Sequence, residues 1–201
     1  MPAGFAGALM CSGLTAYAAL KRLADRAQRA PLLLVGLGEV GLMCLALARA
    51  MFGKVFVADI DGKKRDAALA AGAVQAFDPS DANARKALLK ASGGIYAACD
   101  FAGSDTSLNF AAGVLAKGGK VVVTGLIGGA YSTAVAMFPL KAMTIEGTTT
   151  GTLAEARELI DLVRTKTIEP PPISERPLAD ASAALDNLRA GKIVGRVVLT
   201  A

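Results

Sequence analysis

Short apolar runs alternate with longer Ala- and Leu-rich segments from residue 31 onward. Runs of β-branched and aliphatic residues predict strands, and the longer segments predict helices. We expect strands at 32–35, 55–58, 74–77, 95–100, 120–124 and 143–146, and helices near 40–52, 63–71, 81–91, 106–115 and 153–164. This alternation predicts an α/β fold built on a doubly wound parallel sheet. The glycine pair at 118–119 is expected where a helix stops and the fifth strand begins.

Two segments lie outside this alternation. Residues 1–30 look helical and precede the first strand, and a run of prolines interrupts the pattern at 170–172. Beyond the prolines we expect an extended piece at 173–177, a helix near 179–190 and a final strand at 195–199. The chain is accordingly divided into a helical lead-in (residues 1–30), an α/β core (31–168) and a return segment (169–201).

Composition narrows the function mainly by exclusion. The chain has 201 residues, of which 53% are hydrophobic and 19% charged, so it can bury a sizeable core and lies far from disordered sequences. It contains no histidine. A Ser-His-Asp triad, a Cys-His pair and a zinc site with a histidine ligand therefore cannot be completed within this chain.

Charge and cysteine usage bear on partners and location. The net charge is +5, but the basic residues form short clusters with acids nearby, which is typical of solvated helix faces rather than of a nucleic-acid groove. The three cysteines are widely spaced without a C-x-x-C pattern, which argues against a disulfide framework or a self-contained zinc cluster and favours the cytoplasm. The apolar stretch at 2–20 lacks a basic start and is interrupted by glycines, so we expect neither a signal peptide nor a membrane partner.

The first predicted strand runs directly into a G-x-G-x-x-G sequence, and a helix begins there. In this context the spacing is the fingerprint of a dinucleotide-binding Rossmann domain. Gly36 allows the tight turn, Gly38 lets the backbone approach a pyrophosphate, and Gly41 lets the helix pack against the strand. Glu39 and Val40 are expected to begin the helix. Its first N–H groups and the positive end of its dipole then hold the phosphates. We therefore predict that the core binds a dinucleotide.

A carboxylate at the end of the second predicted strand strengthens this prediction. Asp59 follows Gly41 by eighteen residues and can accept hydrogen bonds from both hydroxyls of the adenosine ribose. It also repels a 2′-phosphate, by roughly 1 to 4 kcal/mol at about 4 Å, which favours NAD over NADP. Lys64 and its basic neighbours at 63 and 65 would attract a 2′-phosphate and so weakly favour NADP. The alternative for Asp59 is a strand-end or helix-capping carboxylate without a ligand.

Two other nucleotide-binding classes fit the sequence less well. A short-chain dehydrogenase needs a Tyr-x-x-x-Lys after the fingerprint, but Tyr17 and Lys21 have that spacing before it. Methyltransferases also use a Gly-rich first turn and an acid on the second strand, with a different glycine spacing.

Four stretches together resemble a known family. They are Met-Cys-Ser-Gly-Leu-Thr-Ala-Tyr at 10–17, the fingerprint with Asp59, Gly-Gly-Lys-Val-Val-Val-Thr-Gly at 118–125 and Gly-Arg-Val-Val-Leu at 195–199. Over essentially its whole length the chain resembles the medium-chain zinc-dependent alcohol dehydrogenases, and within them the propanol-preferring or aryl-alcohol type. The resemblance implies a Rossmann cofactor domain, an NAD cofactor and an alcohol or aldehyde substrate.

The resemblance implies a metal ligand and a catalytic residue in the lead-in. Cys11 matches the cysteine that binds the catalytic zinc, and a thiolate is a strong ligand for Zn²⁺. Thr15, four residues on and so on the same helical face, matches a position that contacts the nicotinamide. Without the resemblance, Cys11 would be interpreted as a small buried apolar residue and Thr15 as a helix-start hydroxyl. Cys44 and Cys99 lie inside a predicted helix and strand, where they are expected in the core.

It also implies further cofactor contacts. Residues after the fourth strand match a loop over the adenosine-side ribose, residues after the fifth match backbone positions beside the nicotinamide carboxamide, and a basic residue near the C-terminus matches an arginine that neutralises the pyrophosphate. In that order they are Phe101, Ala102 and Gly103; Gly125 and Leu126; and Arg196. Arg196 would otherwise be interpreted as a solvated basic residue at the start of a strand.

The chain also departs from the family. Members carry a separate N-terminal catalytic domain that supplies the other zinc ligands, including a histidine, and most of the substrate pocket. We therefore expect one zinc ligand here, NAD binding, and little or no alcohol oxidation by the chain alone. The segments at 173–177 and 197–200 would leave strand edges and apolar surface uncovered. The resemblance further implies a homo-oligomer paired through the sixth strand at 143–146.

A different class of function remains open from the sequence. The chain could be a free-standing dinucleotide-binding sensor, or a subunit that pairs with a separate catalytic protein. Such a module would have no reason to keep Cys11 and Thr15 at their family spacing.

Overall fold

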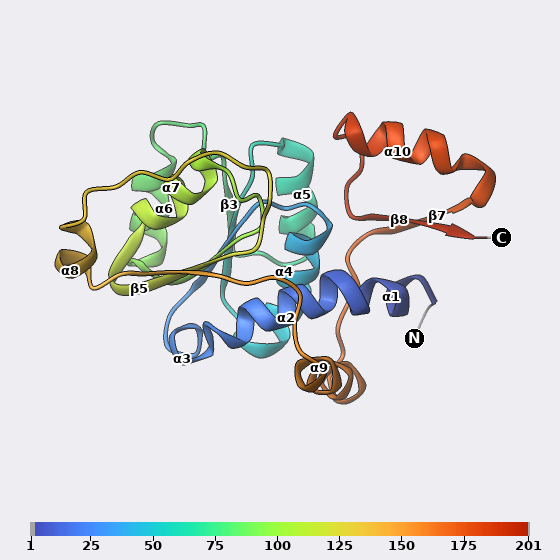
Figure 1. The fold of residues 1–201 in the computed structure, drawn as a ribbon, viewed down its shortest axis with the longest axis horizontal. Coiled ribbons are helices and arrows are strands. Elements are labelled where there is room, and N and C mark those ends of the chain that lie inside the picture. The colour runs from blue at the N-terminus through green and yellow to red at the C-terminus, as the bar shows by residue number, and fades with distance from the viewer. Residues whose placement is uncertain (1–2, 201) are drawn as a thin grey trace.

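A six-stranded parallel sheet occupies the centre of the molecule in the computed structural model, which describes residues 3–200 (Figure 1). Its strands are β1 (Leu32–Val35), β2 (Val55–Ala58), β3 (Gln75–Phe77), β4 (Ile95–Asp100), β5 (Leu115–Val123) and β6 (Thr144–Gly147). Their spatial order is β3-β2-β1-β4-β5-β6. This is the strand order of a Rossmann fold, so the predicted fold class is confirmed. Residues 1 and 2 of the predicted lead-in and residue 201 of the predicted return segment lie outside the described residues.

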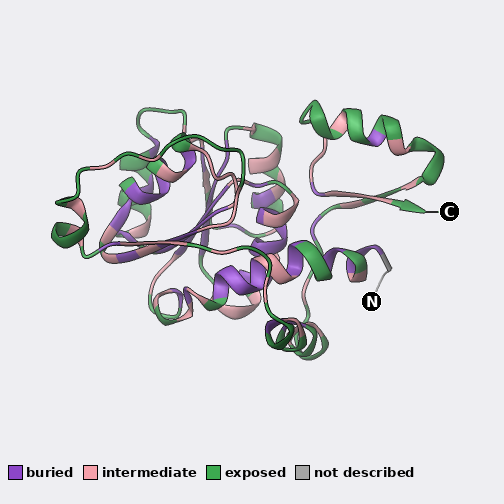
Figure 2. Ribbon diagram, in the orientation of Figure 1, coloured by how far each residue is buried: buried purple, intermediate pink, exposed green. Residues whose placement is uncertain are grey.

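Helices cover both faces of the sheet. They are α4 (Glu39–Met51), α5 (Gly62–Ala70), α6 (Ala84–Ser92), α7 (Asp105–Gly113), α8 (Met137–Lys141) and α9 (Leu153–Thr165). Because successive strand side chains point to opposite faces, Leu32 and Leu34 join a core cluster with α4, while Leu33 and Val35 join a second cluster with α6 and α7. All four leucine and valine side chains of β1 are buried, as Figure 2 shows for the central strands. Two-sided burial explains why these strands have continuous apolar sequences.

The lead-in is helical, as predicted. It consists of α1 (Ala3–Ala8), a π-helical turn (Leu9–Gly13), α2 (Leu14–Lys21) and α3 (Ala24–Ala27). Helix α2 packs against α4 and α9, and its residues 16–20 are buried. The lead-in is therefore part of the main core rather than an appendage.

The return segment forms a small unit of its own. Strands β7 (Ile173–Pro177) and β8 (Arg196–Thr200) pair in parallel, and they are joined by a 3₁₀ turn (Leu178–Asp180) and α10 (Ala181–Arg189). In Figure 1 this unit lies beyond the main sheet, beside the N-terminal helix. The pairing of β7 with β8 was not predicted, and it covers one edge of each strand. Of the apolar residues in the two segments expected to be uncovered, Leu199 is exposed, whereas Ile173, Val197 and Val198 are half-buried. Leu178, Leu185 and Leu188, between the two strands, are also exposed.

The structure corrects the predicted boundary between helix and strand at 106–124. Helix α7 ends at Gly113 and β5 already begins at Leu115, five residues before the predicted start. The register of β4 against β5 shifts between Ile95 and Ala97, and Gly118 adopts a positive φ of 83° within β5. The glycine pair therefore marks an irregularity inside a long strand, where a positive φ favours glycine, and not the start of the strand.

Smaller corrections follow local chemistry. The predicted helix at 81–91 begins at residue 84, because the carboxylate of Asp81 accepts from the Asn83 N–H at 2.9 Å and forms a turn ahead of it. The short helix α8 was not predicted. None of the helices within residues 3–200 combines the length and the apolar character that a membrane crossing requires.

Ion pairs tie the edge of the sheet to neighbouring helices. The guanidinium of Arg22, directly after α2, lies 3.2 Å from a Glu146 oxygen on β6 and 3.3 Å from a Glu155 oxygen on α9. Lys120 of β5 also pairs with Glu146. Single surface pairs stabilise little, but a shared network fixes relative positions. The pairing of copies through β6 stays a prediction.

Candidate functional site

The turn between β1 and α4 requires two of the three fingerprint glycines for packing. Gly36 has a φ of 86°, and a Cβ atom there would lie 2.7 Å from the Ala102 nitrogen. A Cβ atom on Gly41 would overlap the carbonyl oxygen of Gly36. These contacts agree with the predicted tight turn at Gly36 and the close helix–strand packing at Gly41.

Gly38 differs from both neighbours. Its φ is −64°, which any residue can adopt, and a Cβ atom there would meet nothing within 4 Å. Gly38 is the N-cap of α4 and offers no side-chain cap, and the Leu42 N–H makes the first bond of the helix by donating to the Gly38 carbonyl at 2.9 Å. The N–H groups of residues 39–41 precede that bond and have no carbonyl partner in the helix. The fingerprint thus presents open space beside an uncapped helix N-terminus.

Asp59 connects the end of β2 to this turn. Its carboxylate accepts from the Leu37 N–H at 2.6 Å and from the Asp61 N–H at 2.8 Å, and the residue is only 8% exposed. Each carboxylate oxygen has two lone pairs, so both oxygens can accept a further hydrogen bond. Arg65 donates to the Asp59 carbonyl at 2.7 Å and pairs with Asp78, whereas the half-buried Lys64 faces the cleft described next.

A cleft of about 530 Å³ lies at the carboxyl ends of β1, β2 and β4. The predicted residues that line it are Gly36, Gly38, Asp59, Lys64, Phe101 and Ala102. Sequence reasoning missed others, namely Val35, Ala58, Ile60, Pro79, Ser80, Ser104, Thr106, Ser107 and Ile127. Seven of the nine missed residues end a strand or lie within four residues after one, which is the signal that could have found them. The cleft occupies the switch point between β1 and β4, where Rossmann folds bind ligands.

A second hollow, of about 500 Å³, lies between α4, α5 and residues 167–172. Its lining is mostly alanine and proline, with Arg49 and Glu169 among the few charged groups. Arg49 already donates to the Ala71 carbonyl at 2.7 Å. This hollow lacks the converging polar groups of the cleft at β1.

Asp100 organises the loop after β4 and was missed by sequence reasoning. Its carboxylate is fully buried and accepts from the N–H groups of Ala102 and Gly103, both at 3.0 Å, and from the Ser107 hydroxyl at 2.9 Å. Burial raises the pKa of this carboxyl, and the three hydrogen bonds oppose the rise. The sequence signal that could have identified Asp100 is a single acidic residue at the end of an apolar strand, directly before a loop that contains glycine.

The loops after β4 and β5 pack backbone against backbone. A Cβ atom on Gly103 would overlap Gly125, and one on Gly125 would overlap Ala102. The Ile127 N–H donates to the Ala102 carbonyl at 3.1 Å, which locks the two loops together. Of the residues predicted after β5, Gly125 sits in this contact and Leu126 is 91% exposed. Ile127, rather than these two, lines the cleft.

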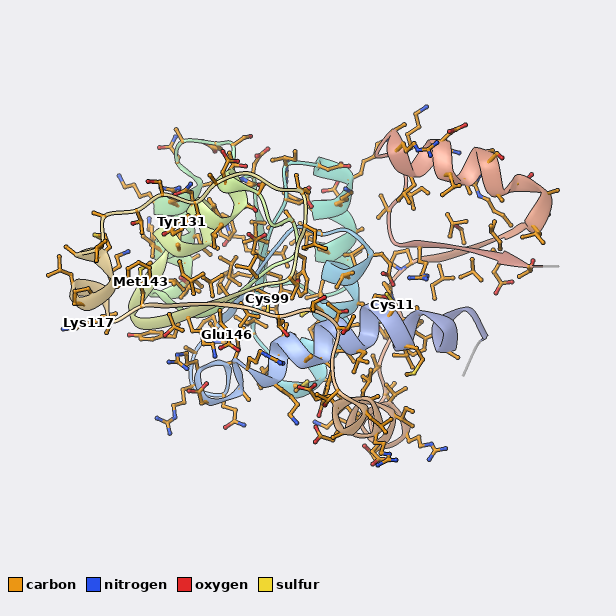
Figure 3. All side chains as sticks on the ribbon, in the orientation of Figure 1. Cys11, Cys99, Lys117, Tyr131, Met143 and Glu146 are labelled. Carbon is orange, nitrogen blue, oxygen red and sulfur yellow. The ribbon has the colours of Figure 1, made fainter. Side chains whose placement is uncertain are left out.

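The structure places Cys11 on the exposed face of the π-helical turn in the lead-in. Figure 3 shows it on the side that faces the β7–β8 unit, whereas Cys99 lies within the sheet. The Thr15 hydroxyl donates to the Cys11 carbonyl at 2.9 Å, so the predicted pair shares one turn. The interpretation of Cys11 as a buried apolar residue is wrong, whereas Cys44 and Cys99 are buried as expected, and burial raises the pKa of the Cys44 thiol.

The described residues do not complete a metal site. Within residues 3–200 no group of three or more Cys, Asp or Glu side chains is placed to hold a metal ion. Zinc therefore does not fit the residues of this chain alone, and Cys11 can contribute one ligand at most.

Arg196 lies against the fingerprint helix although it is distant in sequence. Its guanidinium is 3.3 Å from a carboxylate oxygen of Glu39 and 3.4 Å from the Ser12 hydroxyl, to which it donates. Ser12 in turn donates to the other Glu39 oxygen. The interpretation of Arg196 as a solvated basic residue is wrong, because it joins β8, the lead-in and the start of α4.

Comparison with known proteins agrees with this geometry. Residues 40–165 match the family described as zinc-binding dehydrogenase. The alcohol dehydrogenase of Moraxella sp. is 29% identical over 191 residues, which are 95% of this chain and 56% of that protein. The NAD-dependent alcohol dehydrogenase of Sulfolobus acidocaldarius is 31% identical over 198 residues, covering 96% of this chain and 57% of that protein. The chain thus spans little more than half the length of these relatives.

A solved structure extends the similarity to the fold. The alcohol dehydrogenase of the hyperthermophilic archaeon Aeropyrum pernix superposes with a TM-score of 0.87 at 25% identity, over 96% of this chain and 56% of that one. The match includes the lead-in and the return segment as well as the Rossmann core. The chain belongs to the zinc-binding dehydrogenase family, whose alcohol dehydrogenases it resembles over nearly its whole length.

Proposed function

We propose that this chain binds NAD and forms the cofactor-binding portion of an alcohol dehydrogenase-type oxidoreductase. The observation that carries the proposal is Gly38, a fingerprint glycine that no atom of the described chain requires to be glycine. Space for a Cβ atom, with a permissive φ, indicates that the missing side chain leaves room for a bound group. The adjoining uncapped end of α4 favours an anion there.

The residues of the cleft fit NAD. The N–H groups of residues 39–41 would hold the pyrophosphate, and Arg196, which pairs with Glu39 at the start of α4, would neutralise it. Asp59 has acceptor capacity for the ribose hydroxyls, and its charge disfavours a 2′-phosphate. Asp100 keeps the loop of residues 101–103 in place over the cleft. Bound NAD would supply the hydride acceptor for an alcohol carbon in the complete enzyme.

We propose alcohol oxidation only for a longer protein of which this chain would be the cofactor-binding part. Relatives named NAD-dependent alcohol dehydrogenases are nearly twice as long as the aligned part, since the chain covers 57% of them. We propose that residues 1–30 and 169–201 adjoin a catalytic domain, and that residues 31–168 bind the cofactor. The exposed Cys11 would complete its zinc site with ligands from that domain, and Thr15 would contact the nicotinamide there. A small alcohol or aldehyde is the proposed substrate. A free-standing NAD sensor explains the exposed Cys11 less well.

Alanine substitutions separate the functional glycine from a packing glycine. Gly38→Ala should weaken NAD binding at least about tenfold, because its methyl group enters the pyrophosphate space, while the free energy of unfolding changes by less than about 1 kcal/mol. Gly41→Ala should instead destabilise the fold by about 1–3 kcal/mol, because its methyl group overlaps Gly36. Calorimetric titration with NAD and denaturant unfolding measure the two effects. Unchanged NAD affinity in Gly38→Ala would remove the main support for the site.

Asp59 should set the preference for NAD over NADP. Wild-type protein is expected to bind NAD more tightly, and Asp59→Asn should shift the ratio of the two affinities toward NADP by about fivefold or more, because the repulsion of the 2′-phosphate is lost. Asp66→Asn, on the exposed face of α5, is the matched control and should leave the ratio unchanged. Tighter binding of NADP than of NAD by the wild-type chain would refute the assignment.

The 201-residue chain should bind NAD without oxidising alcohols. We expect no steady alcohol-dependent NADH absorbance when the purified chain is mixed with NAD, zinc and short-chain or aromatic alcohols, because one cysteine cannot hold the metal. Adding a catalytic domain from a related enzyme should restore turnover if this chain is the cofactor portion. Steady turnover by the chain alone contradicts catalytic incompleteness, and NAD binding that no catalytic domain converts into turnover favours the sensor.

A further inference from the structure

The first residue of α4 carries a negative charge that is already paired. Glu39 occupies a variable position of the fingerprint, and its carboxylate accepts from the Ser12 hydroxyl and faces the Arg196 guanidinium at 3.3 Å. The side chains of Glu39 and Arg196 are 17% and 34% exposed. Ser12 is fully buried, and its single hydroxyl proton can be donated either to the Glu39 carboxylate or to the Ala8 carbonyl at 2.9 Å, so the hydroxyl group that faces Glu39 has a fixed place in the lead-in.

In this arrangement the Glu39 carboxylate and a bound phosphate would share two positive partners, the N-terminal end of α4 and Arg196. A carboxylate in the first turn of a helix is stabilised by the helix dipole, and so is a phosphate group at the same end. Arg196 pairs with Glu39 at this end of α4. A phosphate that enters beside Gly38 therefore meets a neighbouring negative charge and an arginine that is already engaged.

We propose that Glu39 is an internal competitor of the cofactor pyrophosphate: it engages Arg196, lowers the affinity for NAD and so favours release of the bound dinucleotide. The inference rests on the proposed NAD site and identifies a residue that tunes it. The competition has a direct electrostatic part, repulsion between carboxylate and phosphate, and an indirect part, the withdrawal of Arg196. The Ser12 hydroxyl holds Glu39 in place, so that only the arginine needs to change partners.

Removing the charge at constant shape tests the competition. Glu39→Gln keeps an oxygen that can accept from Ser12 but pairs weakly with Arg196, so calorimetric titration should show NAD binding about three- to tenfold tighter than in the wild type. Asp186→Asn is the matched control, because it removes one charge from an exposed carboxylate on α10 and should change the affinity less than twofold. Unchanged or weaker binding in Glu39→Gln overturns the inference.

A second pair of variants tests whether Arg196 mediates the effect. In an Arg196→Gln background the gain from Glu39→Gln should shrink to less than half of its wild-type value on the free-energy scale. An equal gain in both backgrounds overturns the competition for Arg196. If Arg196→Gln does not fold, the comparison of wild type with Glu39→Gln is repeated at rising salt, where the affinity ratio must fall as screening weakens the charges. A constant ratio overturns the inference as well.

The outcomes separate this inference from the proposed function. If the wild-type chain and Glu39→Gln both fail to bind NAD, the NAD site itself is wrong. If the wild type binds NAD and Glu39→Gln binds no better, the NAD site stands and only the role of Glu39 fails.

Discussion

The structure depends on one close approach between backbone atoms, where the start of α4 lies against the end of β1. Gly41 has no room for a Cβ atom because the carbonyl of Gly36 fills that space. The contact fixes the direction in which α4 leaves the sheet, so its N-terminal N–H groups open onto the carboxyl edge. Asp59 attaches the same turn to β2 through the Leu37 N–H. Together these contacts order the turn at which we propose the anion site, and a preordered turn lowers the cost of binding.

The opposite wall of the cleft is organised by a different kind of interaction. Burial of the Asp100 carboxylate is costly, and its hydrogen bonds to two backbone N–H groups and to Ser107 offset that cost. These bonds bend the chain after β4 back over the strand ends. Gly103 and Gly125 then allow the loops after β4 and β5 to touch. Close backbone contacts and hydrogen bonds to two buried carboxylates thus hold the cleft on both sides.

Much of this could be predicted because it follows from local patterns. Apolar runs indicated the strands, and the spacing of Gly36, Gly38 and Gly41 predicted the tight turn between β1 and α4. Features that depend on distant contacts were missed. The early start of β5 reflects its pairing with β4, and Asp100 is informative only once three donors converge on it. The proximity of Arg196 to Glu39 joins residues 157 positions apart in the sequence, so no local signal could reveal it.

Amide chemical shifts of the wild-type chain during titration with NAD test the central claim most directly, because each backbone N–H reports its own surroundings. The account predicts that the largest changes fall on Gly38, Gly41 and the residue after Asp59, with little change at Ala70 and Thr167 in the second hollow. The largest changes at that hollow, or none at the fingerprint while NAD binds, would contradict the account.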